Sequence, residues 1–203
     1  MIDEEKKQKG HRQVSGTSFS ETPEVLPSAL VGQQKPGKQV FKMPVRVPPS
    51  KGVLVVDEDH CTTCMQCMHV CALVKHGVGS HELALIQMNA HTLYVLENAA
   101  QPCLQCVDPQ CLRYCPNEAM KVDEKTGARV IDQVRCIGCQ TCIQSCPYDP
   151  PRIRFDRVRK KAVKCDLCGG DPECVKVCPT GALKYYTHPE GVQSGYIQPK
   201  GSN

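Results

Sequence analysis

The chain has 203 residues, which is room for one ordinary domain or two small ones, and 16 of the residues are cysteine. Aromatic residues make up only 4%, tryptophan is absent and the mean hydropathy is −0.35, so large apolar side chains are too few for an extensive core. The formal net charge of +4 does not indicate nucleic acid, because cysteines ionised around metal would add negative charge that this count omits. Small domains that lack a core are held together by disulfides or bound metal, so the cysteines are expected to serve one of these purposes.

The beginning of the chain argues against disulfides. It is highly charged, has no apolar region of the kind found in export signals and carries no paired arginines. No stretch approaches the roughly 18 apolar residues of a membrane span. We therefore expect a cytoplasmic protein with thiolate–metal sites, unless an exported partner chain carries the signal for both.

Residues 1–50 are predicted to form an extended or disordered N-terminal arm. They are rich in lysine, glutamine, serine, glycine and proline and have no sustained apolar period. Residues 40–47 alternate apolar and other side chains, so a segment that becomes ordered by wrapping around a partner stays open as an alternative.

An internal repeat begins near residue 53, with two kinds of unit in alternation. Residues 55–67 and 130–142 share an apolar pair, an aspartate and three cysteines in the same spacing. Residues 103–121 and 165–184 share a C-x2-C pair, an Asp-Pro step, a C-x3-C-P end and an Ala-apolar-Lys segment. The order of units along the chain is therefore A, B, A′, B′.

Short strands are predicted to lead into the cysteine loops, at residues 53–56 and 129–131. Residues 123–127 read Asp-Glu-Lys-Thr-Gly, which predicts a hairpin turn between residues 119–122 and 129–131. Residues 83–88 and 92–96 are predicted to form a further strand pair. The pattern does not favour long helices.

The first and third motifs have the bacterial ferredoxin spacing C-x2-C-x2-C-x3-C. Motif I comprises Cys61, Cys64, Cys67 and Cys71, and motif III comprises Cys136, Cys139, Cys142 and Cys146. A loop with two residues between ligands can bring three thiolates to three corners of one cubane, while the fourth points elsewhere. In two-cluster ferredoxins that fourth cysteine binds the other cluster.

The second and fourth motifs have a longer gap before the third cysteine, and an Asp-Pro turn signal lies in each gap. Motif II comprises Cys103, Cys106, Cys111 and Cys115, and motif IV comprises Cys165, Cys168, Cys174 and Cys178. Sixteen ligands, at four for each cubane, predict four 4Fe-4S clusters. Glycines within or beside the ligand loops, Gly138, Gly169 and Gly170, fit either backbone N–H donation to sulfur or simple tight turns.

Other interpretations of the cysteines fit less well. Zinc ribbons also use paired C-x2-C units, but zinc gives no reason for a third cysteine at the same spacing or for the C-x3-C-P end. A 3Fe-4S cluster usually follows the loss of a cysteine, and none is missing. The sequence has no glycine-rich phosphate loop, nucleophile elbow or catalytic triad, so the chain is not expected to be an enzyme itself.

Residues 52–186 resemble the electron-transfer subunits of the dimethyl sulfoxide reductase type, which accompany molybdenum and tungsten enzymes, formate dehydrogenases and some hydrogenases. The chain is most similar to small soluble members that serve tungsten aldehyde oxidoreductases and the tungsten-dependent class II benzoyl-CoA reductase. That narrower resemblance lies at Cys71-Ala-Leu-Val-Lys-His-Gly-Val, Lys164-Cys-Asp-Leu-Cys-Gly-Gly-Asp-Pro-Glu-Cys and Cys178-Pro-Thr-Gly-Ala-Leu.

The resemblance implies that motif I pairs with motif IV and motif II with motif III. The implied fold is α+β, with two bacterial-ferredoxin-like modules at residues 51–90 plus 162–188 and at residues 91–161, followed by a C-terminal tail at residues 189–203. The implied ligands are Cys61, Cys64, Cys67 and Cys178 for cluster 1, Cys71, Cys165, Cys168 and Cys174 for cluster 2, Cys103, Cys106, Cys111 and Cys146 for cluster 3, and Cys115, Cys136, Cys139 and Cys142 for cluster 4. The repeat order also permits I with II and III with IV, and spacing alone leaves both open.

Two features depart from the family pattern. Ala72 stands in motif I where a proline usually follows the fourth cysteine, which leaves the direction of the chain after Cys71 open. The C-terminal membrane helix of some larger relatives is also missing.

Residues 152–164 are strongly basic, and we interpret them as a solvated strand pair in preference to a docking face.

The sequence therefore predicts a non-catalytic electron-transfer subunit with four 4Fe-4S clusters. Its expected partners are a large catalytic oxidoreductase subunit, with tungsten or molybdenum, and a further protein that supplies or accepts electrons; no nucleic acid and no membrane span are expected. The alternatives are a free-standing polyferredoxin and a zinc-stabilised interaction module.

Overall fold

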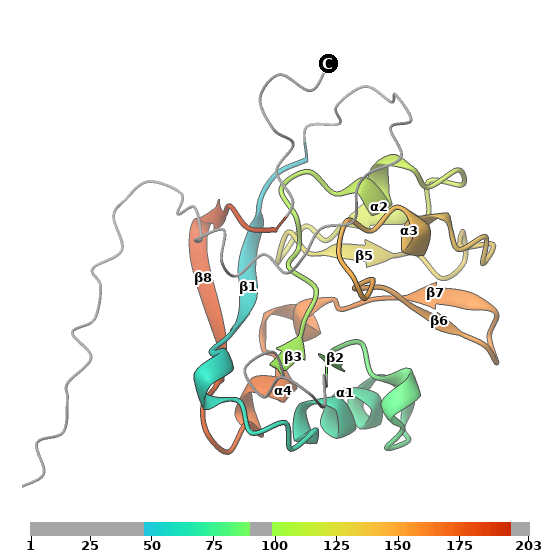
Figure 1. Cartoon of the computed structure of the whole chain (residues 1–203). Helices are drawn as coiled ribbons and strands as arrows, with labels where there is room; N and C mark the ends of the chain where they lie inside the picture. Colours follow the sequence, from blue (N-terminus) through green and yellow to red (C-terminus); the bar gives the residue numbers. More distant parts are fainter. Residues whose placement is uncertain (1–46, 90–98, 196–203) are drawn as a thin grey trace, which may run out of the picture.

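The computed structural model describes residues 47–89 and 99–195 as a small mixture of short strands and short helices (Figure 1). The predicted N-terminal arm lies outside the described residues, apart from its last four positions. Of these, Ser50 is fully buried and is the first residue of a strand, so the ordered part begins slightly earlier than predicted. No helix in the described ranges has the length and apolar character needed to cross a bilayer.

The described strands form four two-stranded antiparallel sheets. The pairs are β1 (Ser50–Val56) with β8 (Leu183–Val192), β2 (Gln87–Asn89) with β3 (Ala99–Gln101), β4 (Met120–Val122) with β5 (Arg129–Ile131), and β6 (Arg154–Asp156) with β7 (Lys161–Val163). Only β1 and β8 join distant parts of the sequence, and they lie side by side at the left of Figure 1.

The hairpin predicted around residues 123–127 is confirmed, because β4 and β5 pair in register from Met120 with Ile131. Its turn is held by Asp123, whose carboxylate accepts hydrogen bonds from the backbone N–H and the hydroxyl of Thr126. Of the other predicted pair, residues 87 and 88 do form a strand, but its partner is β3. The predicted partner at residues 92–96 lies outside the described part of the chain.

The sequence did not predict strand β8, which runs to Val192 and so includes the first four residues of the predicted tail. This segment contains Pro189 and Gly191, which disfavour a regular strand. The structure accommodates it as a bulge, because the β8 residues between Thr187 and Val192 oppose only Lys51 of β1. Beyond the strand, the Ser194 hydroxyl donates to the Leu104 carbonyl, which ties this end to the motif II loop.

Each unit contains one short helix. In the A-type units it begins soon after the second cysteine, and in the B-type units it begins directly after the Asp-Pro step. Helices α2 (Gln110–Arg113), α3 (Thr141–Gln144) and α4 (Glu173–Lys176) have four residues each and end before a Cys-Pro pair, whereas α1 (Gln66–His76) has 11. The difference follows from Ala72: proline at this position would end the helix, whereas alanine continues it and is fully buried. This helix ends at Gly77, which has the left-handed conformation.

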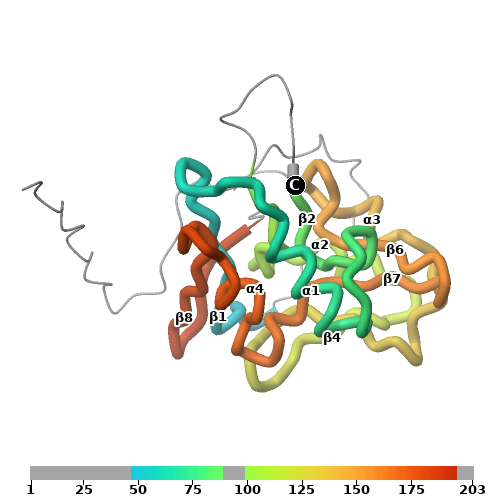
Figure 2. Tube along the Cα trace, turned by 90° about the horizontal axis from the view of Figure 1, so that it is seen from below, coloured from blue at the N-terminus to red at the C-terminus, as the bar shows by residue number. Residues whose placement is uncertain are grey.

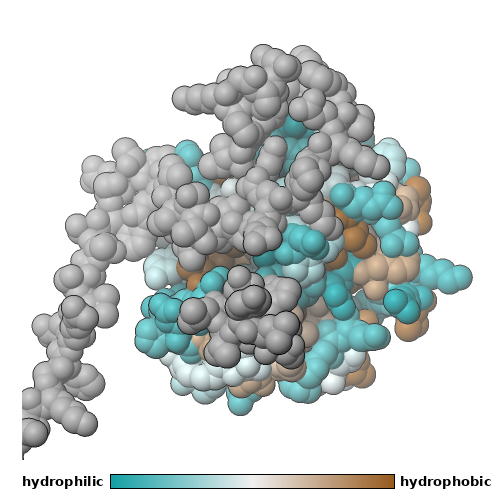
Figure 3. All heavy atoms as spheres, viewed as in Figure 1, coloured by the Kyte–Doolittle hydropathy of each residue, from teal (hydrophilic) through white to brown (hydrophobic). Residues whose placement is uncertain are grey.

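The buried apolar residues form two clusters. The larger includes Leu54, Met68 and Leu167, and the smaller is built on Met120 and Ile153; both include cysteines. Helix α1 packs against α4, and α2 packs against α3 (Figure 2). The face in Figure 3 is a mosaic of hydrophilic residues and small apolar areas, without a single broad apolar surface among the described residues.

Candidate metal centres

All sixteen cysteines lie in the described residues, and none forms a disulfide. The structure gathers their side chains into four groups, each with three thiols from one motif and one from another. Set 1 is Cys61, Cys64, Cys67 and Cys178; set 2 is Cys71, Cys165, Cys168 and Cys174; set 3 is Cys103, Cys106, Cys111 and Cys146; set 4 is Cys115, Cys136, Cys139 and Cys142. Motif I thus meets motif IV, and motif II meets motif III.

The four C-x2-C loops share one backbone feature. In each, the residue just before the second cysteine has a positive φ: 54° at Thr63, 51° at Gln105, 73° at Gly138 and 58° at Leu167. A left-handed residue at this position curls the loop, so that both cysteines can face one side. Gly138 is required for a second reason, since a Cβ there would lie 2.1 Å from the Lys160 carbonyl oxygen.

The fourth cysteine of every motif accepts a backbone hydrogen bond from a residue that follows it. The N–H···S pairs are Leu85 to Cys71 at 3.4 Å, Ala119 to Cys115 at 3.3 Å, Arg152 to Cys146 at 3.3 Å and Leu183 to Cys178 at 3.5 Å. These donors are not the loop glycines that the sequence suggested. Hydrogen bonds to sulfur stabilise the negative thiolate form and tune the potential of an iron-sulfur centre.

Burial and mutual repulsion oppose ionisation of the most buried thiols. Burial raises the pKa of Cys67 to about 11, of Cys142 to about 11 and of Cys174 to about 12, and negative charge on neighbouring cysteines adds to the effect. The pKa of Cys111 in set 3 is also raised, again by burial first. Four thiolates in such a space need a compensating positive charge, which bound iron supplies.

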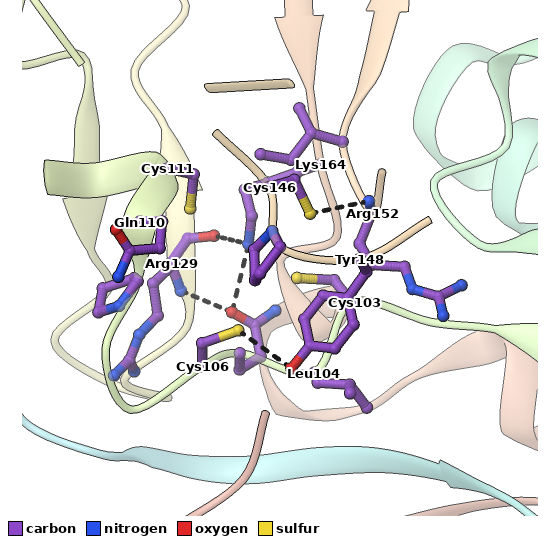
Figure 4. Close-up of a pocket in the computed structure, with 14 residues that line it drawn as sticks. Cys103, Leu104, Cys106, Gln110, Cys111, Arg129, Cys146, Tyr148, Arg152 and Lys164 are labelled. Atoms are coloured by element: carbon purple, nitrogen blue, oxygen red, sulfur yellow. Dashed lines mark hydrogen bonds between the residues drawn. The ribbon is translucent and has the colours of Figure 1, made fainter. Parts of the chain in front are cut away.

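Set 3 surrounds a pocket with about 360 Å³ of space not filled by atoms, including its open mouth (Figure 4). Three cationic residues line it together with the cysteines: Arg129, Arg152 and Lys164 are only 1%, 6% and 6% exposed. Burial alone would lower the pKa of Lys164, but negative charge on Cys103 and other thiols outweighs this and raises it. The lysine is therefore held in its charged form.

Set 4 surrounds a pocket of similar size, with about 350 Å³ of unfilled space. Its lining has no charged side chain and includes the apolar residues Ala119, Met120, Ile131 and Ile137. Cys139 in this set is exposed, as is Cys64 in set 1. The two pockets thus have the same number of thiols but very different surroundings.

The residues around set 3 fit an anionic group such as a cluster bound by thiolates. The Nε–H groups of Arg129 and Arg152 are buried and have no hydrogen-bond partner among the described residues. A buried donor without an acceptor costs about 1–3 kcal/mol, so these guanidinium groups favour negative charge in the space beside them.

A single-ion site is not found in the described residues, which include every cysteine: no three or more His, Cys, Asp or Glu side chains converge closely enough to hold one metal ion. The thiols of sets 3 and 4 are spread around pockets with about 360 and 350 Å³ of unfilled space. This spacing gives no support to a zinc site, in which four sulfurs lie about 2.3 Å from one ion.

The sequence did not identify the non-cysteine residues of the set 3 pocket. Arg152 and Lys164 were interpreted as part of a solvated basic stretch, and Arg129 was placed only in a strand. Gln105 is fully buried and hydrogen-bonded to both Arg129 and Cys165, yet nothing in the loop sequence marks it as special. Gln105 occupies the same place in its C-x2-C loop as Gly138 does in motif III, and only this correspondence would have indicated that the backbone is constrained there.

Comparison with known proteins indicates the type of cofactor. The 4Fe-4S dicluster domain family matches residues 94–187. The polyferredoxin-like subunit of aliphatic sulfonate oxidoreductase from Pyrococcus furiosus is 38% identical over 125 residues, which are 62% of this chain and 70% of that relative. The chain belongs to the polyferredoxin-like iron-sulfur subunits. As a member of this family, the polyferredoxin-like chain binds 4Fe-4S clusters.

Other relatives of this polyferredoxin-like chain are also subunits of oxidoreductases. The beta subunit of NADH-dependent phenylglyoxylate dehydrogenase from Aromatoleum evansii is 35% identical over 140 residues, covering 66% of this chain but 30% of the relative. The iron-sulfur subunit of formate dehydrogenase-O from Escherichia coli is 41% identical over 91 residues, covering 42% of this chain and 30% of the relative. The chain thus spans less than a third of these two relatives.

One solved structure with a related trace is the active site complex BamBC of benzoyl coenzyme A reductase with benzoyl-CoA. Its chain has a TM-score of 0.40 and 16% identity, over 68% of this chain and 80% of that one. A similarity at this level is too distant to carry an argument about the present protein.

Proposed function

We propose that the protein binds four 4Fe-4S clusters, one in each thiol set, and conducts electrons between a catalytic oxidoreductase partner and an external donor or acceptor. The observation that carries this proposal is the grouping of sixteen thiols into four sets of four, each with one cysteine from a second motif. The chemistry that the clusters supply is one-electron transfer, and the protein contributes ligands, burial and charge.

The sets follow one another in the order 1, 2, 3, 4. Set 1 and set 2 meet at helix α1, which carries both Cys67 and Cys71. Sets 3 and 4 meet at the end of helix α3, because Cys142 lies in this helix and Cys146 follows its last residue by two positions. Between sets 2 and 3, Cys165 and Cys103 are close enough for each charge to affect the other. This order supports a linear path through the molecule.

The two outer sets reach the surface. Cys64 of set 1 and Cys139 of set 4 are exposed, whereas set 3 has two buried and two half-buried thiols. A carrier that exchanges electrons with two other proteins needs a cluster near the surface at each end. We therefore assign electron entry and exit to sets 1 and 4, in either direction.

Two ferredoxin-like modules, one at residues 51–90 and 162–188 and the other at residues 91–161, are part of the proposal. The packing of α1 on α4 and of α2 on α3 supports this division, as do the two apolar clusters. The partner in our proposal is a tungsten or molybdenum enzyme in the cytoplasm. The family resemblance in the sequence and the oxidoreductase names of the relatives support that choice.

Anaerobic purification of the untagged protein from its native source tests the function. We expect about sixteen iron atoms per chain, brown colour, and a co-purifying large subunit that contains tungsten or molybdenum. A colourless protein with stoichiometric zinc would contradict the cluster proposal. A pure monomer that retains four clusters would contradict the subunit role and favour a free polyferredoxin.

The thiol sets themselves are tested by paired substitutions. Cys111→Ala should remove one cluster, assigned to set 3, and Cys142→Ala another, assigned to set 4, each with a loss of about four iron atoms. Val158→Ala, at an exposed position between motifs III and IV, is the control and should retain all iron. Loss of the same cluster signal in both cysteine variants would contradict the assignment.

A further inference from the structure

The set 3 pocket concentrates positive charge inside the protein. Arg129, Arg152 and Lys164 all line it and are almost fully buried, whereas the lining of the set 4 pocket has no charged residue. Buried cations are uncommon unless something compensates them, because taking a charge out of water is costly. Three around one pocket therefore need an explanation.

Neutral groups, rather than carboxylates, hold these three cations. The Lys164 ammonium donates to the Arg129 carbonyl at 2.6 Å and lies 3.4 Å from the Gln105 side-chain oxygen. The Arg129 guanidinium donates to the carbonyls of Gly127 at 2.6 Å and Pro48 at 2.9 Å. No described carboxylate forms an ion pair with any of the three, so within the described residues their positive charges are not cancelled by a carboxylate.

Arg152 is fixed by a different set of contacts. Its guanidinium donates to the side-chain oxygen of Gln101 and lies over the ring of Tyr148, 5.6 Å from the ring centroid. Its own backbone N–H donates to the sulfur of Cys146, a member of set 3 (Figure 4). The backbone N–H of Arg152 thus points to set 3, whereas its guanidinium extends away from the Cys146 sulfur past the Tyr148 ring and interacts with the thiolates through its charge alone (Figure 4).

Among the described residues that line this pocket, only the cysteines can carry negative charge as thiolates. Their charge acts on all three cations. Arg129 is influenced by Cys103, Cys106 and Cys111, Arg152 by Cys103, Cys106 and Cys146, and Lys164 by Cys103, Cys111 and Cys165. Lys164 therefore also faces set 2, through Cys165. Arginine stays protonated in proteins, so two of the three charges are permanent.

Reduction of a 4Fe-4S cluster adds one electron and one negative charge. A nearby positive charge stabilises the reduced form more than the oxidised form, and the effect is larger in a buried site of low dielectric constant. The set 4 pocket, with the same thiol ligands and no cations, lacks this stabilisation.

We propose that Arg129, Arg152 and Lys164 raise the reduction potential of the set 3 cluster above that of the set 4 cluster, so that an electron shared between these two clusters rests on set 3. The inference rests on the proposed four-cluster function. In the step concerned, the set 3 cluster accepts one electron from a low-potential donor protein, or from dithionite in the test, with no bond made or broken. The three cations do not bind the cluster; they act on its potential through their positive charge.

A redox titration with dithionite, followed by electron paramagnetic resonance, tests the inference on the purified holoprotein. Cys111→Ala and Cys142→Ala identify the signals of sets 3 and 4 by their disappearance. In the wild type, the set 3 signal should develop at the higher potential. A set 3 signal that develops at the same or a lower potential than set 4 would overturn the proposal.

Arg152→Gln should decrease the equilibrium constant for reduction of the set 3 cluster at least about tenfold, which is a shift of about 59 mV for one electron. Arg152→Lys keeps the positive charge, so the set 3 potential in this variant should stay close to that of the wild type. Arg157→Gln removes an exposed charge from the same hairpin and should change no potential by more than about twofold in equilibrium constant. Equal shifts in the Gln and Lys variants would mean that packing, not charge, is responsible, which overturns the inference.

Lys164→Gln is a second, independent variant for the case in which Arg152→Gln does not retain iron. It should also lower the set 3 potential. It should lower the set 2 potential by a smaller amount, because Lys164 also lies near Cys165. Iron content separates the two levels of the proposal. A protein with about sixteen iron atoms and an unchanged set 3 potential refutes only this inference, whereas a wild-type protein without the set 3 cluster refutes the proposed function.

Discussion

The pockets of set 3 and set 4 are built from loops of the same kind, but the side chains around these loops differ strongly. Each has four thiols, a C-x2-C loop with one left-handed residue and a fourth cysteine that accepts a backbone N–H. One pocket is lined by three cations, and the other by apolar and uncharged polar side chains. The comparison teaches that cysteine spacing determines where ligands meet, whereas the residues packed around them, from other parts of the chain, determine the electrostatic environment.

A single position in the repeat separates the two environments. Gln105 in set 3 and Gly138 in set 4 both precede the second cysteine of their loops. The Gln105 side chain is fully buried and links Arg129, Lys164 and Cys165, whereas Gly138 lets the Lys160 carbonyl close directly over its loop. The polar connection around set 3 thus depends on a residue that set 4 cannot accommodate.

Removal of iron should have the largest effect on the molecule. Both apolar clusters contain cysteines, and without a cluster the cations around set 3 lose the negative charge that compensates them. Anaerobic chelation should therefore unfold the described core, and hydrogen exchange should show the greatest loss of protection in β5 and the motif II loop. An apoprotein that keeps native protection around set 3 would contradict this account of the buried charges.

Gln105→Ala should be the most damaging single substitution outside the cysteines. It leaves the buried Arg129 N–H and the Lys164 ammonium with fewer partners, at a cost of about 3 kcal/mol. The cluster of set 3 should then be lost at lower urea concentration, as measured by bleaching in the visible range. Gln140→Ala is the matched control, since Gln140 is an exposed glutamine beside set 4, and it should cost less than about 0.5 kcal/mol. Equal effects of the two variants would remove the distinction between the loops.

Gly138→Ala should affect set 4 selectively. The new Cβ would lie 2.1 Å from the Lys160 carbonyl oxygen, and the alanine would have to adopt a φ of 73°, so a loss of about 3 kcal/mol is expected, with early bleaching of the set 4 cluster. Gly169→Ala is a close control because Gly169 has a φ of 68° and a Cβ added there would have no atom within 4 Å. It should cost about 1 kcal/mol. If both glycine variants behave alike, the close approach of Lys160 has no energetic role.

Asp132→Asn, in the turn that leads into motif III, should have the smallest effect. Hydrogen bonds from Lys121 and from the N–H groups of Val134 and Arg135 hold the pKa of Asp132 at about 2, below its usual 3.8. A lowered carboxyl pKa stabilises the fold above pH 3.8, and this contribution is lost as the pH falls toward 2. The variant should therefore be slightly less stable than wild type in urea, by the same amount at about pH 6, 7 and 8. A difference that changes across this range would point to another titrating group.

The sequence predicted the type of cofactor and the β4–β5 hairpin, because cysteine spacing and turn chemistry are local properties. It also located the departure at Ala72, although only the structure shows that the consequence is a longer helix. The buried cations could not be predicted. Arg157 and Arg159 are exposed, as a solvated basic hairpin should be, whereas Arg152 and Lys164 at its two ends are buried. The difference comes from the thiols packed against them, and no local pattern encodes that proximity.

The exchange of the fourth cysteine also imposes an order on biosynthesis. Sets 3 and 4 have all of their thiols once the ribosome has made residue 146, whereas sets 1 and 2 each need cysteines from motif IV, up to residue 178. The central part of the nascent chain can therefore mature while the first motif still waits for its partner. A transcript truncated after β7 would yield a product that retains one half of the electron path and lacks the other.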